Sequence, residues 1–164
     1  MPILSQNSLE FTSRSVDQTR RLGMRLGGLL RVGDVIALTG DLGSGKTTFV
    51  QGVAQGWGST DTVSSPTFVL VNQYRRPDGS KLHHMDAYRL GSALEAEDLD
   101  IDAMLESGSL VVEWAERISE VLPADRLTLQ MTWFGDELRN MIFIPHGKRY
   151  QDLMIEFRHQ AFGG

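Results

Sequence analysis

Residues 40–47 read Gly-Asp-Leu-Gly-Ser-Gly-Lys-Thr and fit the pattern G-x-x-x-x-G-K-[ST]. The glycines of such a loop let the backbone curl, so that successive N–H groups point inward at phosphate oxygens. A helix that begins directly after the loop adds the positive end of its dipole. The lysine supplies a point charge to the phosphates, and the threonine supplies a hydroxyl to Mg²⁺. The motif therefore predicts a phosphate-binding loop between a buried strand and a helix.

The sequence on either side of the loop meets this requirement. Residues 35–38 are a short apolar run typical of a buried strand, and residues 46–55 predict the helix. Further strands are predicted at residues 68–74, 81–86, 110–112, 126–133 and 140–144, with helices over 92–105, up to Leu122 before Pro123, and over 149–157. Because strands and helices alternate, the chain is predicted to form a layered α/β fold.

The first predicted helix has an unusual number of glycines. Ser15 and Gln18 have the spacing of a capping box, so the helix is expected to start at Ser15. Leucines at positions 22, 26, 29 and 30 would line one face. Glycines at positions 23, 27 and 28 weaken the helix on propensity alone. Close packing against a neighbouring element would explain them.

The composition excludes several classes of protein. A chain of 164 residues is the size of one domain, so we expect a single domain over residues 1–164. The absence of cysteine excludes a disulfide scaffold, a Cys-type zinc site and a cysteine nucleophile. A net charge of −5 argues against an autonomous grip on nucleic-acid phosphates. No apolar run is long enough to span a membrane and no signal peptide is evident, so a cytoplasmic location is expected.

A metal-side acid is expected at the end of a second strand, and two residues qualify. Glu113 follows the apolar run Leu-Val-Val, whereas Asp86 ends a more polar strand, so the pattern favours Glu113. Thr67 follows Ser65-Pro66 just before a strand, where its hydroxyl could sense a γ-phosphate or the metal. An ordinary strand-start threonine fits the same pattern equally well.

Histidine and tryptophan residues also invite a functional interpretation. His83 and His84 are adjacent on a predicted strand and would point to opposite faces, so they cannot easily share one metal ion. One of them is expected at the surface and the other partly packed. Trp57, Trp114 and Trp133 are each expected to be packing residues, although Trp114 directly follows Glu113 and stays open as a site residue.

Four motifs occur in one order along the chain: residues 40–48 (Gly-Asp-Leu-Gly-Ser-Gly-Lys-Thr-Thr), 65–68 (Ser-Pro-Thr-Phe), 84–90 (His-Met-Asp-Ala-Tyr-Arg-Leu) and 112–114 (Val-Glu-Trp). In these motifs the chain resembles the TsaE (also called YjeE) family of small bacterial ATPases, from about residue 16 to residue 147. The resemblance implies a P-loop NTPase fold, a three-layer α/β sandwich with a mixed central sheet. It also implies a role in making threonylcarbamoyladenosine at position 37 of tRNA.

The resemblance further implies ATP and Mg²⁺ as cofactors and an Mg²⁺-dependent ATPase that is slow on its own. It places ATP over the loop of residues 40–47, called the Walker A loop below. It also places Thr47 and Glu113 on the metal side and Asp86 as a second functional acid. The site residues that it implies are Gly43, Ser44, Gly45, Lys46, Thr47, Thr48, Thr67, Asp86, Glu113 and Trp114, with Thr19 and Arg139 as weaker assignments outside strong motifs.

The implied partners are the tRNA threonylcarbamoyl-transferase subunit (TsaD type) and its non-catalytic companion (TsaB type), with no membrane and no direct tRNA contact. A small-molecule or nucleotide kinase is the alternative, but the arginines form no lid-like cluster in the sequence. A guanine-nucleotide switch would need an Asn-Lys-x-Asp stretch, which the sequence lacks. Adenine is therefore favoured over guanine.

Overall fold

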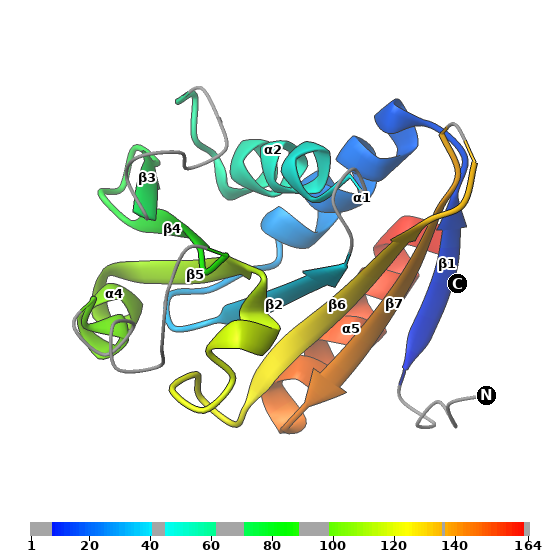
Figure 1. The fold of residues 1–164 in the computed structure, drawn as a ribbon. Coiled ribbons are helices and arrows are strands. Elements are labelled where there is room, and N and C mark those ends of the chain that lie inside the picture. The colour runs from blue at the N-terminus through cyan, green and yellow to red at the C-terminus, as the bar shows by residue number, and fades with distance from the viewer. Residues whose placement is uncertain (1–7, 41–44, 62–70, 89–98, 136, 163–164) are drawn as a thin grey trace.

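The strands of the computed structural model form one mixed sheet, in the order β1-β7-β6-β2-β5-β4-β3 (Figure 1). The structure describes residues 8–40, 45–61, 71–88, 99–135 and 137–162. The strands are β1 Leu9–Ser13, β2 Val35–Gly40, β3 Val71–Arg75, β4 Lys81–Asp86, β5 Gly108–Glu113, β6 Arg126–Trp133 and β7 Arg139–His146. The helices are α1 Val16–Gly27, α2 Lys46–Trp57, α4 Ile101–Ser107, η1 Ala115–Arg117 and α5 Lys148–Phe162. No helix in these ranges is both long and apolar enough to cross a membrane.

Four neighbouring strands run in parallel, and this direction decides where the chemistry can lie. β2 pairs in parallel with both β5 and β6, and β5 pairs in parallel with β4. The carboxyl ends of these strands therefore share one edge of the sheet, the edge at which open α/β sheets bind ligands. The outer pairs β3–β4, β6–β7 and β7–β1 are antiparallel. We call the shared edge the carboxyl edge.

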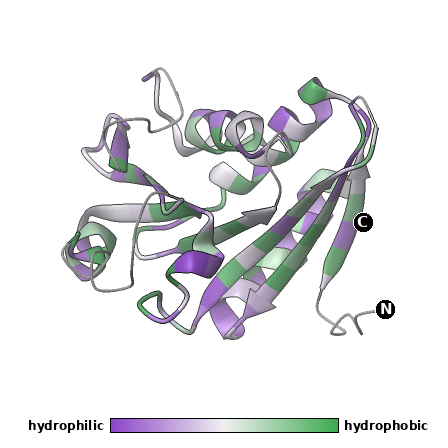
Figure 2. Ribbon diagram, in the orientation of Figure 1, coloured by the Kyte–Doolittle hydropathy of each residue, from purple (hydrophilic) through white to green (hydrophobic). Residues whose placement is uncertain are grey.

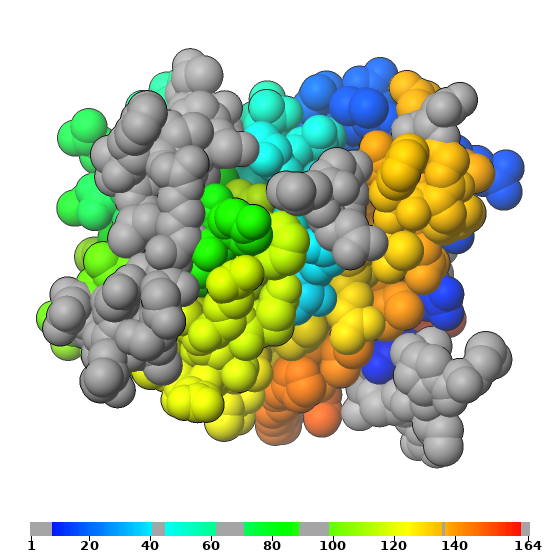
Figure 3. Space-filling view, in the orientation of Figure 1, coloured from blue at the N-terminus to red at the C-terminus, as the bar shows by residue number. Residues whose placement is uncertain are grey.

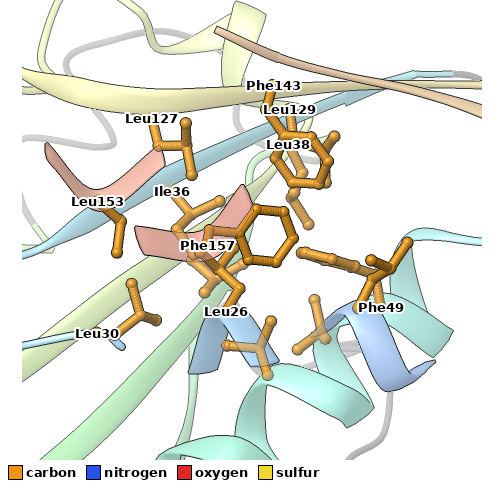
Figure 4. Packing of buried hydrophobic residues seen from close by; sticks show 14 of the residues in the cluster. Leu26, Leu30, Ile36, Leu38, Phe49, Leu127, Leu129, Phe143, Leu153 and Phe157 are labelled. Atoms are coloured by element: carbon orange, nitrogen blue, oxygen red, sulfur yellow. The ribbon is translucent and has the colours of Figure 1, made fainter. Parts of the chain in front are cut away.

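The sheet is covered on both faces, which confirms the predicted three-layer α/β sandwich. Side chains of α1, α2 and α5 pack on one face with Ile36, Leu38 and Phe143 of the sheet, and Phe157 of α5 lies among them (Figure 4). On the other face, Ile101 of α4 and Ile118 pack in a second cluster. The sheet contributes Val35, Ala37, Leu110 and Val112 to this cluster. Hydrophobic and hydrophilic residues alternate along β6 and β7 (Figure 2), as expected of strands with one buried face.

The glycines of α1 are explained by its contact with α2. A Cβ atom placed on Gly23 or Gly27 would lie 2.3 or 2.1 Å from a backbone oxygen of α2. A Cβ placed on Gly52 or Gly56 of α2 would lie 2.0 Å from a backbone oxygen of α1. The two helices therefore touch backbone to backbone, as small residues on both sides permit. The expected cap is also present, because the Ser15 side chain accepts a hydrogen bond from the Gln18 backbone N–H.

Several predictions of secondary structure were wrong. A helix was predicted over 92–105, but among the described residues α4 begins at Ile101. Asp100 has a φ of 53° and caps α4, because its side chain accepts a hydrogen bond from the Ala103 N–H. The helix predicted up to Leu122 is a single 3-10 turn, which Trp114 starts from a left-handed conformation at φ of 59°. β1 was not predicted, although Leu9, Phe11 and Ser13 alternate toward one face.

The two histidines of β4 were also placed wrongly, because both are buried. They point to opposite faces as expected, with His83 bonded to the Ser107 hydroxyl at 3.2 Å and His84 on the α2 side. Trp133 is 52% exposed and so is not the packing residue that was expected. It lies at the end of β6, where the hairpin leaves the sheet.

Burial of His83 predicts that the protein loses stability in mild acid. Burial, followed by the charge of Lys81, lowers the pKa of His83 below its ordinary value of 6.5. Below about pH 6.5, His83 takes up a proton in the unfolded chain more readily than in the folded chain. The free energy of unfolding therefore decreases as the pH is lowered through this range. We expect the melting temperature to drop between about pH 7.5 and pH 5.5, and to drop less in His83→Gln. An equal drop in the variant would assign the effect to another group.

Candidate functional site

The Walker A loop connects β2 to α2 at the carboxyl edge. Gly40 ends β2, and Gly45 enters α2 with φ of 95°, a left-handed conformation that glycine adopts without strain. The first turn of α2 contains no acidic residue, so nothing there opposes an anion at the positive end of the helix dipole. The predicted site residues Gly43 and Ser44 lie outside the described residues, as does Thr67.

Lys46 is held at the base of this loop. Its side chain is largely buried, and Nζ donates a hydrogen bond of 2.8 Å to the carbonyl oxygen of Gly40. The same ammonium lies 3.9 Å from the centroid of the Trp114 ring, a cation–π distance. Lys46 and Trp114, both predicted from the sequence, are thus in direct contact. Thr47 and Thr48 follow in the first turn of α2, as the motif requires.

Both candidate acids lie at the carboxyl edge. Asp86 and Glu113 end the paired parallel strands β4 and β5 and are register partners, and Glu113 also pairs with Leu38 of β2. Glu113 is buried at 6% exposure, whereas Asp86 is partly buried and accepts a hydrogen bond of 2.9 Å from the Tyr88 N–H. Residues 87–88 after β4 lie beside the residues that follow β5 on the face shown in Figure 3, where the Tyr88 and Trp114 rings are 5.0 Å apart. The structure thus places both acids next to each other at the carboxyl edge.

Thr19 and Arg139 also come to the start of α2. They line a small pocket with Val16, Gly45 and Thr48. Thr19 is buried, and its hydroxyl is 2.7 Å from the Ser13 hydroxyl at the end of β1. The Arg139 guanidinium donates a hydrogen bond of 3.0 Å to the carbonyl oxygen of Leu138 in the β6–β7 turn. Both residues therefore reach the carboxyl edge from distant parts of the chain.

His84 contacts the predicted site residue Glu113 and was not itself predicted as a site residue. Its Nε2 lies 2.5 Å from the Glu113 carboxylate, and its Nδ1 lies 3.1 Å from the Tyr74 hydroxyl. A signal was available, because alternate residues of a strand share a face and His84 is two residues before Asp86. The partner acid on β5 could not be read from that spacing, since it depends on the pairing of two strands.

The described oxygen donors fit a Mg²⁺ ion that arrives with a nucleotide. Mg²⁺ takes oxygen ligands and is commonly held by one or two carboxylates together with substrate phosphates and water. Among the described residues no three His, Asp or Glu side chains form a metal-binding group, so a cage made of protein side chains alone is not present there. The buried Glu113 carboxylate and the Thr47 hydroxyl instead suit an ion that is completed by phosphates.

Trp114 offers a direct probe of this site. Its ring lies against Lys46 and, with a centroid separation of 5.0 Å, against Tyr88. We expect ATP to change Trp114 fluorescence in a Trp57→Phe, Trp133→Phe background, because a phosphate that draws Lys46 away alters the environment of the ring. The matched control keeps Trp57, which lies under Arg76 at 3.8 Å, and carries Trp114→Phe and Trp133→Phe. A flat titration of the Trp114 protein would remove this ring from the nucleotide site.

Comparisons with known proteins agree on one family. The family model described as threonylcarbamoyl adenosine biosynthesis protein TsaE matches residues 13–141. The tRNA threonylcarbamoyladenosine biosynthesis protein TsaE of Bacillus subtilis is 40% identical over 154 residues, which cover 92% of this chain and 95% of the relative. The protein of the same name from Streptomyces coelicolor is 44% identical over 137 residues, covering 80% and 93%. The crystal structure of Bacillus subtilis YdiB superposes with a TM-score of 0.80 at 31% identity, covering 98% of this chain and 99% of that one.

Proposed function

This chain belongs to the TsaE family, whose members take part in tRNA threonylcarbamoyladenosine biosynthesis, and we propose that it serves that pathway as an Mg²⁺-dependent ATPase. One observation carries the proposal. Lys46, Asp86 and Glu113 all lie at the carboxyl edge of the sheet, and Lys46 begins α2, whose positive dipole end favours an anion. The kinase alternative is not favoured, because the family match covers most of the chain.

Each side chain has a distinct role in the proposed site. Lys46 leaves the Gly40 carbonyl and binds the β- and γ-phosphates, while backbone N–H groups at the start of α2 bind the remaining phosphate oxygens. Glu113 and Thr47 hold Mg²⁺, which when bound neutralises charge on the phosphate oxygens. Asp86 orients the attacking water or the water shell of the ion. Thr67 reports the γ-phosphate to the partner surface.

Replacing Glu113 by glutamine should raise the Mg²⁺ concentration needed for ATP binding by roughly tenfold, because a neutral amide is a far weaker Mg²⁺ ligand. The measurement is calorimetric titration with ATP at a series of Mg²⁺ concentrations. Asp86→Asn is the matched control, since it makes the same chemical change on the neighbouring strand. If only Asp86→Asn shifts the Mg²⁺ requirement, the metal role belongs to Asp86.

We further propose that ATP turnover acts on the transferase complex and not on tRNA directly. The net charge of −5 argues against strong binding of RNA by this chain. It fits a subunit whose ATP hydrolysis acts on a protein partner. We expect slow hydrolysis in isolation, because the proposed site is completed by the partner, and positioning and electrostatic stabilisation provide most of the catalysis in phosphoryl transfer.

The decisive experiment combines a pull-down and an ATPase assay with the TsaD-type and TsaB-type subunits. We expect binding to the pair of subunits and a faster ATP turnover in their presence. A protein that binds neither subunit, and whose ATP consumption is instead accelerated by a small metabolite, would replace this proposal with the kinase.

A further inference from the structure

A line of three polar side chains runs across the α2-covered face of the sheet beside the proposed site. Tyr74 of β3, His84 of β4 and Glu113 of β5 are 3%, 0% and 6% exposed. The Tyr74 hydroxyl is 3.1 Å from His84 Nδ1, and His84 Nε2 is 2.5 Å from Glu113 Oε2. The line thus connects the edge strand β3, through β4, to Glu113 on β5.

The chemistry of the three groups sets the direction of the hydrogen bonds. An ionised carboxylate only accepts, so the imidazole carries its hydrogen on Nε2 and donates it to Glu113. In a neutral imidazole Nδ1 is then an acceptor, and the Tyr74 hydroxyl must donate to it. Glu113 therefore selects the Nε2–H tautomer, and the Tyr74 hydroxyl, by donating to Nδ1, fixes the orientation of the imidazole ring that holds Glu113. Without the Tyr74 hydroxyl, the ring would lose the hydrogen bond at Nδ1 that orients it.

Burying these three polar side chains lowers the stability that the same positions could provide, which suggests that the arrangement serves the site. Three polar groups leave water on folding, and an apolar pair at positions 74 and 84 would fill the same space without that cost. Tyr74 is moreover the one buried residue of β3, where its four neighbours are partly buried or exposed. The hydroxyl of that single inward residue is directed at the histidine that holds Glu113.

We propose that Tyr74 and His84 are positioning residues for the Glu113 carboxylate. His84 occupies Oε2 and prevents the carboxylate from rotating, so that Oε1 is the oxygen presented to Mg²⁺ when nucleotide is bound. Partners that orient a metal ligand in this way commonly contribute ten- to a hundredfold in metal affinity, as an order-of-magnitude range. This inference rests on the proposed function, because it assigns Glu113 to the metal.

Tyr74→Phe and His84→Gln test the inference, each with a matched control. Tyr150→Phe also removes a buried tyrosine hydroxyl, one that accepts a hydrogen bond from Val35 N–H at the start of β2, away from the carboxyl edge. His83→Gln changes the adjacent buried histidine, which faces the other side of the sheet. Full-length proteins are titrated with ATP at a series of Mg²⁺ concentrations, and nitrogen-15 NMR reads the tautomer of His84 without nucleotide.

We expect Tyr74→Phe to raise the Mg²⁺ concentration for half-maximal binding by roughly tenfold, to leave Mg²⁺-free ATP binding unchanged, and to keep the Nε2–H tautomer of His84, because Glu113 still accepts its hydrogen. His84→Gln keeps a donor toward Glu113 and should cost less. The double variant Tyr74→Phe, His84→Gln should need about the same Mg²⁺ concentration as His84→Gln alone, since Tyr74 acts through the His84 imidazole. Both controls should match the wild-type Mg²⁺ dependence.

Two results would overturn the inference while the proposed function stands: an Nδ1–H tautomer in the wild type, or a Mg²⁺ dependence of Tyr74→Phe that equals that of Tyr150→Phe. A wild-type protein whose ATP binding ignores Mg²⁺ would instead overturn the metal role of Glu113, and this inference with it. The two failures are distinguishable because only the second abolishes the Mg²⁺ dependence of ATP binding in the wild-type protein.

Discussion

Replacing Lys46 by alanine should weaken ATP binding by roughly 100-fold, since a charge-assisted hydrogen bond to a phosphate contributes about 3 kcal/mol. The Lys46 ammonium already lies at the loop, bonded to Gly40 and stacked on Trp114, so binding requires only a short movement of the side chain. Hydrolysis should fall further, by about 10²–10³-fold, because the charge on the phosphates grows in the transition state. Calorimetry measures the first effect, and phosphate release measures the second.

Lys148→Ala is the control for this experiment. It removes the same charge, but from an exposed side chain on α5 that pairs with Asp152 at 3.0 Å. Its ATP affinity should equal that of the wild type, because a surface pair of this kind contributes little. Thermal unfolding of both variants shows whether the fold is kept. A folded Lys46→Ala protein with wild-type affinity would refute the assignment of the phosphate-binding loop.

Gly27→Ala should cost about 3 kcal/mol in the free energy of unfolding, although alanine is intrinsically the better helix former by about 1 kcal/mol. The added Cβ would lie 2.1 Å from the Val53 carbonyl oxygen and 3.0 Å from the Trp57 backbone nitrogen. Backbone atoms in the middle of α2 cannot move aside individually, so α1 and α2 must separate. For a chain of this size the melting temperature should fall by about 10 °C.

Gly28→Ala is the matched control at the next position. Gly28 has φ of −69°, a conformation open to any residue, and the nearest atom to an added Cβ is 3.6 Å away. We expect a neutral or slightly raised melting temperature, because alanine restricts the unfolded chain more than glycine does. Equal losses in the two variants would show that helix propensity, and not the contact between α1 and α2, decides stability here.

The sequence predicted the parts of the site that are local in the chain. The Walker A loop constrains its own flanks, and the apolar runs on either side identified β2 and α2 almost to the residue. The two acids were identifiable because each ends a recognisable strand. Their placement at one edge followed from the parallel pairing of those strands.

The rest depended on contacts between distant segments. Thr19 and Arg139 carry no local motif, and only the resemblance to a family pointed to them before the structure showed both beside Gly45. The Tyr74–His84–Glu113 line requires three strands in register, which no single-strand pattern encodes. The start of α4 at Ile101 was missed because a side-chain cap at Asp100 can begin a helix at a point that propensity alone does not mark.

The strand order also has a consequence for the order of assembly during synthesis. β1 leaves the ribosome first, yet its partner in the sheet is β7, whose residues 139–143 come late in the chain. The pocket at the start of α2 shares this dependence, because it needs Thr19 from one end and Arg139 from the other. Closing so long a loop is slow and unfavourable until the other contacts exist. The pocket can therefore form only after residue 139 has been synthesised, so a ligand that needed both residues would bind after the sheet has assembled and not before.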